Sequence, residues 1–191
     1  VSGKGVNAGM VMARAITLFK IYSKNKFKPN EIHYEMNNDL HQTNPKGVYV
    51  TSIVGSYNSK TDIVELSNAG HLPALFKKGR EFIEYDSSSM PLGVKKADNN
   101  KEYKLETIKL EDGRLYCFTD GFSECRNEKG DEIGIDGVKN LIINYQNTSL
   151  KKELSKIIKD VESKSTKDKN IDNVNTDNIL EDDLTIIGLG K

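Results

Sequence analysis

The chain lacks the features that would assign it to a nucleic-acid or membrane protein. Lys plus Arg and Asp plus Glu both number 28, so there is no basic excess to displace counterions from nucleic-acid phosphates. No apolar run approaches the roughly 20 residues that a membrane span needs, and no secretory signal is visible. We therefore expect no nucleic-acid partner, no membrane span in this segment, and a cytoplasmic location.

Cysteine is also scarce. The two cysteines, Cys117 and Cys125, flank the sequence TDG, and nothing pairs them into a disulfide framework or a zinc site. We expect reduced thiols.

With 191 residues, the chain is long enough for one domain. It begins at Val1, inside a motif, so we treat it as a piece of a longer protein, with room for a preceding sensor or membrane region.

The spacing of apolar residues predicts two helices near the start of the chain and two in its last third. Residues 6–23 are expected to be helical, and Pro29 opens a second helical pattern over residues 29–42. Residues 135–145 and 149–161 are also helical in pattern. The apolar positions near one face of the first helix are Val6, Met10, Ala13, Ile16 or Thr17, and Lys20 or Ile21. Residues 162–181 are rich in Lys, Asn and Asp and are expected to form a flexible surface loop.

Period-two alternation begins near residue 47 and indicates strands. We expect strand pairs that turn at NSKT, KKGR and EDGR, and a buried final strand, LTIIGLG. The helices are grouped rather than alternating with the strands. The predicted fold class is therefore α+β, with layered antiparallel sheets rather than a parallel doubly wound sheet.

Two acidic motifs stand beside expected strands. Asp120 in TDG ends one strand, and Asp182 and Asp183 in EDDLTII come directly before another. Magnesium and manganese prefer oxygen ligands, so the two strands could converge on one divalent-metal site. Each motif alone also has an ordinary explanation: a strand-ending Asp-Gly turn, or acidic residues that cap a loop.

Two other motifs have structural explanations that we prefer. The sequence VSGKG before a helix resembles a phosphate loop, but Gly5 follows Lys4 where Ser or Thr is needed. A glycine-rich helix entry with a solvated lysine is the simpler interpretation. His71, in NAGHLPALF, could be a base or a metal ligand, but a histidine in such a turn is more often hydrogen-bonded scaffolding.

Five motifs, taken in order, resemble those of PPM-type metal-dependent protein serine/threonine phosphatases, in the SpoIIE/RsbU branch. They are VSGKGVNAGMVMA, SNAGHLPALF, MPLGV, RLYCFTDGFSECRNEKGDEIG and DDLT, and they cover nearly all of the chain. The resemblance implies a four-layer α/β/β/α sandwich of two antiparallel sheets flanked by helices. Residues 1–191 would form a single domain without its N-terminal strands. It also implies two manganese or magnesium ions that activate a bridging water to attack phosphoserine or phosphothreonine.

Carried over residue by residue, the resemblance implies that Asp120 and Asp182 are catalytic metal ligands and that the backbone carbonyl of Val1 is a weaker one. The residues that would support these ligands are Gly121, Asp183 and Thr185. The aspartate that precedes Val1 in the family would lie upstream of this sequence. We therefore expect the fragment to bind metal weakly and to be close to inactive, and the parent protein to be a phosphatase.

The resemblance also implies partners. In this branch the substrates are typically phosphorylated anti-sigma-factor antagonists, and the helices matching residues 6–23 and 29–44 often form a regulatory dimer switch. A local alternative is that these helices simply cover a sheet. Two rival functions stay open: a catalytically dead phosphatase-like module that only binds its partner, and a nucleotide-binding protein that uses SGKG. Acidic residues upstream of Val1 would argue against the first, and an ATP titration would test the second.

Overall fold

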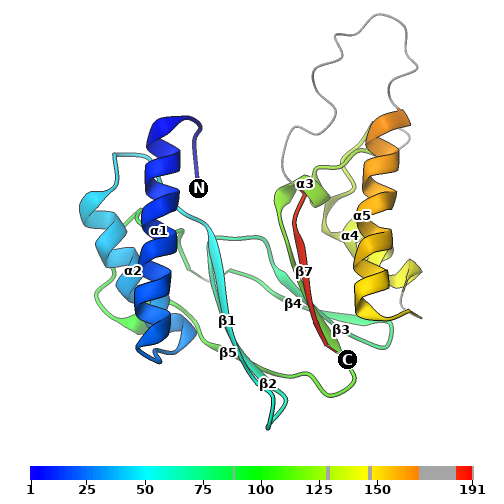
Figure 1. The fold of residues 1–191 in the computed structure, drawn as a ribbon, viewed down its shortest axis with the longest axis horizontal. Helices are drawn as coiled ribbons and strands as arrows, with labels where there is room; N and C mark the ends of the chain where they lie inside the picture. Colours follow the sequence, from blue (N-terminus) through cyan, green and yellow to red (C-terminus); the bar gives the residue numbers. More distant parts are fainter. Residues whose placement is uncertain (88, 128–129, 146–147, 168–183, 191) are drawn as a thin grey trace, which may run out of the picture. The chain divides into compact units, whose positions relative to one another are not determined.

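The computed structural model describes residues 1–87, 89–127, 130–145, 148–167 and 184–190. These residues group into two compact units, Val1–Pro73 with Tyr85–Glu111 and Ala74–Glu84 with Asp112–Lys191. Each unit has an antiparallel sheet and its own helices (Figure 1). The α+β class, with two antiparallel sheets flanked by helices, is confirmed. That residues 1–191 form a single, N-terminally truncated domain stays a prediction.

The first unit begins with two helices that pack against each other, α1 (Val6–Lys24) and α2 (Pro29–Thr43). A proline occupies the first position of α2, and the carboxylate of Glu31 accepts the Lys28 N–H at 2.8 Å, which together fix where this helix begins. The four-residue spacing correctly predicts the buried face of α2. Its buried apolar side chains are Ile32, Met36 and Leu40.

The helix α1 buries a different face from the one that its sequence pattern predicts. Its buried residues are Val11 and Ala15, while Val6 and Met10 of the predicted stripe are 80% and 63% exposed. The helix carries apolar residues on several sides, so periodicity alone cannot select the side that packs against α2. The large apolar side chains left exposed on α1 are Val6, Met10, Met12, Ile16, Phe19 and Ile21.

The sheet of the first unit has the order β1-β2-β5, formed by β1 (Ser52–Asn58), β2 (Ile63–Ala69) and β5 (Glu106–Lys109). The hairpin turn at NSKT is confirmed, although β1 begins later than residue 47. On the inner side of this sheet lies a buried histidine of α2. The Nδ1 atom of His33 is 2.9 Å from the hydroxyl of Ser67, and Nε2 is 3.3 Å from that of Ser52. These contacts join α2 to both long strands.

The sheet of the second unit has the order β4-β3-β6-β7. Its strands are β3 (Ala74–Lys78), β4 (Glu81–Tyr85), β6 (Arg114–Phe118) and β7 (Ile186–Gly190). The hairpin at KKGR is confirmed. The predicted pairing across EDGR is wrong, because β5 pairs with β2 whereas β6 lies between β3 and β7. Three of the five residues of β6 are buried, which suits a central strand.

The final strand is less buried than its apolar sequence predicts. Ile187 of β7 is 65% exposed, and β7 stands at the end of the strand order. One face is closely covered, because a Cβ added at Gly188 would lie 2.9 Å from the side chain of Leu150 in α5. The strand β7 therefore packs one face against α5 and leaves the face of Ile187 exposed to solvent.

Three helices belong to the second unit: α3 (Asp120–Ser123), α4 (Gly134–Asn144) and α5 (Leu150–Lys167). The helix α5 contacts both α4 and β7, and lies beside β7 in Figure 1. Because α5 continues to Lys167, the first part of the loop expected at 162–181 is helical instead. Residues 168–181 of that prediction lie outside the described part of the chain.

A buried charge cluster fastens α5 to the sheet. Glu153 of α5 is fully buried, forms an ion pair with Arg114, and accepts a hydrogen bond from the Tyr116 hydroxyl at 2.7 Å. Arg114 also donates to the carbonyl of Thr148 at 3.1 Å. Burial and the Glu153 carboxylate both raise the pKa of Tyr116, so the phenol stays protonated as a donor.

Candidate metal centre

Asp120 lies where β6 gives way to the short helix α3. The flanking residues Phe118 and Phe122 are buried, so both sides of this junction are anchored in the core of the second unit. The Phe122 N–H donates to the Thr119 carbonyl at 3.1 Å, and the Glu124 N–H donates to the Asp120 carbonyl at 2.8 Å. The predicted Asp-Gly turn is thus a helix start that holds the main chain of Asp120 in place.

The carboxylate of Asp120 is exposed and available to a ligand. Its Oδ1 atom accepts the N–H of Gly121 at 3.1 Å, and no residue within the described ranges forms an ion pair with it. An exposed carboxylate oxygen without a basic neighbour suits a hard divalent cation. Asp120 therefore fits the role of metal ligand, as one donor of the several that such a cation requires.

A pair of hydrogen bonds connects the residue before Asp120 to the start of β7. The Thr119 N–H donates to the Thr185 carbonyl at 3.0 Å, and the Thr185 N–H donates to the Thr119 hydroxyl oxygen, also at 3.0 Å. The sequence predicted a supporting role for Thr185 but none for Thr119. The only available signal was the position of Thr119 directly before the aspartate of TDG.

The remaining predicted ligands lie in other parts of the chain. Asp182 and Asp183 lie outside the described part of the chain. Val1 belongs to the first unit, where its neighbour Ser2 donates its N–H to the carbonyl of Tyr49 at 2.9 Å. Over the ranges that the structure describes, no group of three or more His, Cys, Asp or Glu side chains could hold a metal ion.

The glycine-rich segment before α1 is a helix entry, as the simpler interpretation of its sequence expects. Gly3 and Gly5 have φ of 82° and 83°, a conformation that favours glycine, and α1 begins directly after Gly5. Lys4 between them is exposed. This short entry gives no support to a phosphate loop.

The motifs NAGHLP and MPLG meet each other inside the first unit. Gly70 has φ of 69°, and a Cβ added there would lie 2.4 Å from the ring of Pro91. The Asn68 side chain accepts the N–H of His71 at 2.9 Å and donates to the carbonyl of Leu72 at 3.0 Å. Hydrogen bonds to the main chain of His71 therefore build a tight turn, which agrees with scaffolding.

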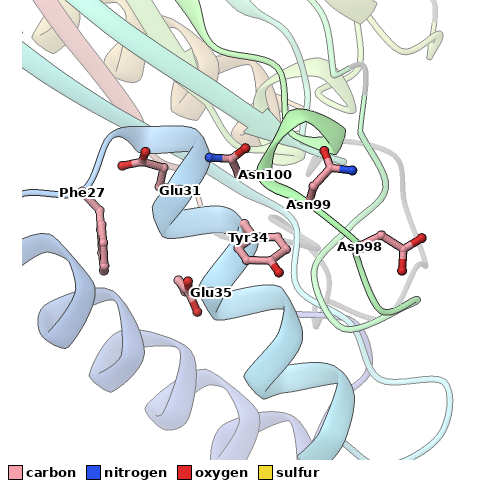
Figure 2. Close-up of a pocket in the computed structure, with 7 residues that line it drawn as sticks. All are labelled: Phe27, Glu31, Tyr34, Glu35, Asp98, Asn99 and Asn100. Carbon is pink, nitrogen blue, oxygen red and sulfur yellow. The ribbon is translucent and has the colours of Figure 1, made fainter.

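A separate polar pocket of about 310 Å³ lies between α2 and residues 98–100 (Figure 2). Glu31, Glu35 and Asp98 line it, but in Figure 2 the carboxylate of Asp98 lies on the opposite side from Glu35. Glu31 is already occupied with the first turn of α2. None of the site residues predicted from the sequence lines this pocket, and its carboxylates do not converge as metal ligands do.

Comparison with known proteins gives one family. The family model described as stage II sporulation protein E (SpoIIE) matches residues 1–190. None of the curated proteins compared with the chain matches it. Within the described ranges, no helix combines the length and apolar character needed to cross a bilayer.

Solved structures with the same fold include PP2C domains. The SiaA-PP2C domain of Pseudomonas aeruginosa is 15% identical, with a TM-score of 0.77, covering 100% of this chain and 71% of that one. The PP2C phosphatase domain of SpoIIE from Bacillus subtilis, with a fragment of its regulatory domain, is 16% identical, with a TM-score of 0.72 and coverage of 97% and 51%. RsbX in complex with magnesium is 15% identical, with a TM-score of 0.66 and coverage of 98% and 75%.

Proposed function

Because this chain belongs to the SpoIIE family, whose fold is that of PP2C-type phosphatase domains, we propose that it hydrolyses phosphoserine or phosphothreonine in a protein, with manganese or magnesium as cofactor. Asp120 and Asp182 would be two of the carboxylate ligands that hold two ions in the full-length protein. The observation that supports this best is the pair of hydrogen bonds between Thr119 and Thr185. It ties the residue before Asp120 to a residue shortly after Asp182.

Covalent geometry lets the two carboxylates share a site. Thr119 adjoins Asp120, and Asp182 precedes Thr185 by three residues. Three residues of fully extended chain span at most about 11 Å. With Thr185 hydrogen-bonded to Thr119, this length would allow Asp182 to reach a metal that Asp120 binds.

The bound metal and the protein side chains would have different roles in the reaction. When bound, manganese or magnesium would activate water for attack on phosphorus and offset negative charge on the phosphoryl group. Asp120 offers a carboxylate whose main chain is fixed, and Gly121 adds no side chain that could crowd the ligand oxygens. Asp183 and Thr185 would orient Asp182, and the carbonyl of Val1 would be a weaker ligand.

The mechanism is tested by replacing Asp120 in the full-length protein. Hydrolysis of p-nitrophenyl phosphate and of phosphoserine peptides should require added manganese or magnesium, and Asp120→Asn should abolish it, since the amide loses the ligand charge. Asp112→Asn is the matched control, because Asp112 is an exposed carboxylate whose contact with Lys78 is a surface ion pair. Metal-independent turnover, or full activity of Asp120→Asn, contradicts the proposal.

The alternative of a catalytically dead binding module is separated by the same assay. Such a module would retain a phosphoprotein without releasing phosphate, with or without metal.

For the substrate we propose a phosphorylated anti-sigma-factor antagonist, in keeping with the RsbU-like sequence motifs. The compartment that we propose is the cytoplasm, because the sequence has only two cysteines and no pattern of a disulfide framework.

The exposed apolar face of α1 supports a homodimer formed through α1 and α2. Met10 and Ile16 are 63% and 45% exposed, which is unfavourable for a helix that remains in water. We expect the full-length protein to be dimeric in light scattering, and Met10→Glu with Ile16→Glu to give a monomer. Ile83→Glu, at a 53% exposed position of β4, is the control and should stay dimeric. A wild-type monomer at micromolar concentration contradicts this proposal.

A further inference from the structure

The last turn of α1 and the turn that leads into α2 form an exposed basic segment, residues 19–28 (FKIYSKNKFK), which we name the α1–α2 tip. It belongs to a longer stretch, residues 1–30, that contains six basic residues and no acidic one, although the whole chain has 28 of each. Positive charge is therefore concentrated in this part of the first unit. The six basic residues are Lys4, Arg14, Lys20, Lys24, Lys26 and Lys28.

Most of the positive charge of the tip is not neutralised within the first unit. Lys28 lies 3.5 Å from a carboxylate oxygen of Glu65 in a surface ion pair. The other three lysines of the tip are exposed, and no ion pair joins Lys20, Lys24 or Lys26 to another residue in the described ranges. A lysine in the last turn of a helix suits the helix dipole, which explains Lys24. It does not explain the lysines that lie beyond the end of α1.

The acidic residues of α2 are engaged elsewhere in the unit. Glu31 accepts the N–H of Lys28 at 2.8 Å, and Asp39 accepts the hydroxyl of Tyr22 at 2.5 Å. Glu35 lines the polar pocket of Figure 2. The exposed lysines of the tip are thus available to a partner that carries negative charge.

Large apolar side chains alternate with these lysines. Phe19, Ile21 and Phe27 are 41%, 50% and 38% exposed. The ring of Phe27 lies beside that of Tyr22, with the ring centroids 6.1 Å apart, so the turn holds it in place. Exposed lysines together with exposed aromatic and aliphatic side chains are typical of segments that lie at the surface of an anionic bilayer. The lysines meet the headgroups, and the apolar side chains enter the boundary with the acyl chains.

The length of the tip suits this boundary. Phe19 lies five residues before Lys24, the last residue of α1, which corresponds to roughly 7.5 Å along a helix. Segments of this kind enter a bilayer surface to a depth of about 5–10 Å. A bilayer that meets the end of α1 would therefore receive Phe19 and Ile21 at the depth of the acyl boundary.

An acidic protein surface fits the tip less well than a bilayer does. A stable protein interface uses about 20–30 residues on each side, whereas the tip consists of residues 19–28 alone. A fluid bilayer needs no surface of complementary shape. We propose that the α1–α2 tip binds the surface of a bilayer that contains anionic lipid. This proposal goes beyond the proposed function, and it uses a later part of α1 than Met10 and Ile16, on which the dimer proposal rests.

The test places a fluorescent probe in the tip of the full-length protein. Asn25 is exposed in the turn, so Asn25→Cys labelled with the fluorophore NBD reports the transfer of this position from water to lipid. The probe reports on the tip itself, whatever else holds the protein at a membrane. Protein without the added cysteine, treated with the same reagent, gives the background. Phosphatidylcholine vesicles with about 30% phosphatidylserine should raise the emission and shift it to the blue, and high salt should reverse this, whereas phosphatidylcholine alone should have no effect.

Charge variants of the labelled protein test the lysines. Each lysine near an anionic bilayer contributes about fivefold to binding. Replacing Lys20, Lys24 and Lys26 together by Gln should therefore weaken binding to the anionic vesicles about hundredfold. The matched control removes the same charge from exposed positions of α5 and should bind like the wild type; it combines Lys151→Gln, Lys152→Gln and Lys159→Gln.

An apolar variant tests the insertion. Phe19→Gln with Ile21→Gln keeps every lysine of the tip, so it should still associate with anionic vesicles at low salt. The blue shift of the probe should be smaller, because less of the tip enters the acyl boundary. A blue shift equal to that of the wild type contradicts the insertion of these side chains.

The remaining outcomes decide between the bilayer and its alternatives. An emission that anionic vesicles do not change overturns the proposal, and so does an equal loss of binding in the α5 control, because net charge alone would then be the cause. Soluble poly-glutamate stands in for an acidic protein. If it changes the emission as strongly as the vesicles do, the tip binds acidic protein segments and the bilayer proposal fails.

Thermal unfolding of each variant is followed in parallel. Should the triple variant fail to fold, Lys24→Gln with Lys26→Gln provides the same comparison, with an expected loss of about 25-fold. None of these measurements uses phosphatase activity. The failure of this proposal and the failure of the proposed function are therefore distinguishable.

Discussion

Replacing Glu153 by leucine tests how the second unit holds its long helix. The carboxylate is fully buried, and it is the shared partner of Arg114 and of the Tyr116 hydroxyl. Its removal leaves a largely buried guanidinium and a buried phenol without their acceptor. Lys77 lies in the same cluster: burial lowers its pKa, and Glu153 acts in the opposite direction. The variant therefore makes the charged form of Lys77 less favourable as well.

The size of the effect follows from these contacts. Removing one member of a buried ion pair costs about 3–5 kcal/mol, because the other charge is left uncompensated. The side chain of Arg114 is 16% exposed and keeps its hydrogen bond to Thr148, so it retains some solvation. We therefore expect the free energy of unfolding to fall by about 3 kcal/mol, the lower end of that range.

Urea unfolding followed by circular dichroism measures this change by linear extrapolation. Adding Arg114→Met to Glu153→Leu should recover much of the loss, because an apolar pair can replace a buried ion pair at little cost. Glu84→Leu is the control: the side chains of Glu84 and its partner Lys139 are 38% and 20% exposed, and their pair should contribute less than about 1 kcal/mol. A loss below about 1 kcal/mol for Glu153→Leu, or a double variant less stable than the single one, refutes the reasoning.

Two further predictions concern the first unit. Burial lowers the pKa of His33 to about 3, so between about pH 6.5 and 3 the unfolded chain binds a proton that the folded chain does not. The contribution of neutral His33 to the free energy of unfolding should therefore be fully present above about pH 6.5. Below that pH it should fall by up to about 1.4 kcal/mol per pH unit. Urea titrations at several pH values should show a smaller slope for His33→Gln. Gly70→Ala should lower the free energy of unfolding by at least about 2 kcal/mol, because of the left-handed conformation and the clash with Pro91. Gly79 has a similar φ but open space around it, so Gly79→Ala should lower it by about 1 kcal/mol. Equal losses of stability in thermal unfolding would contradict the role of the clash.

The elements that the sequence predicted well are those whose signal is local. The proline and the four-residue spacing of Ile32, Met36 and Leu40 identify α2, because a helix is closed by contacts within a few residues. The hairpins at NSKT and KKGR have the same origin. The pairing across EDGR failed for the opposite reason: β5 and β6 are neighbours in sequence, but each finds its partners in a different sheet.

The candidate site shows the same division. The motif TDG singled out Asp120 because residue types and their order are properties of the sequence. The residue before Asp120 is joined to β7 by a hydrogen bond from the N–H of Thr185, 66 residues away, to the hydroxyl of Thr119. No periodicity reports a contact over that separation, so the hydrogen bonds between Thr119 and Thr185 could not be predicted.

The sequence by itself determined the fold class, the family and the aspartate that follows β6, since these depend on residue type, order and local spacing. Only the tertiary structure decided which face of α1 is buried, which strands pair, and how the chain around Asp120 is fastened to β7. Each of those outcomes depends on segments that are distant in the chain and meet only when the sheets have formed.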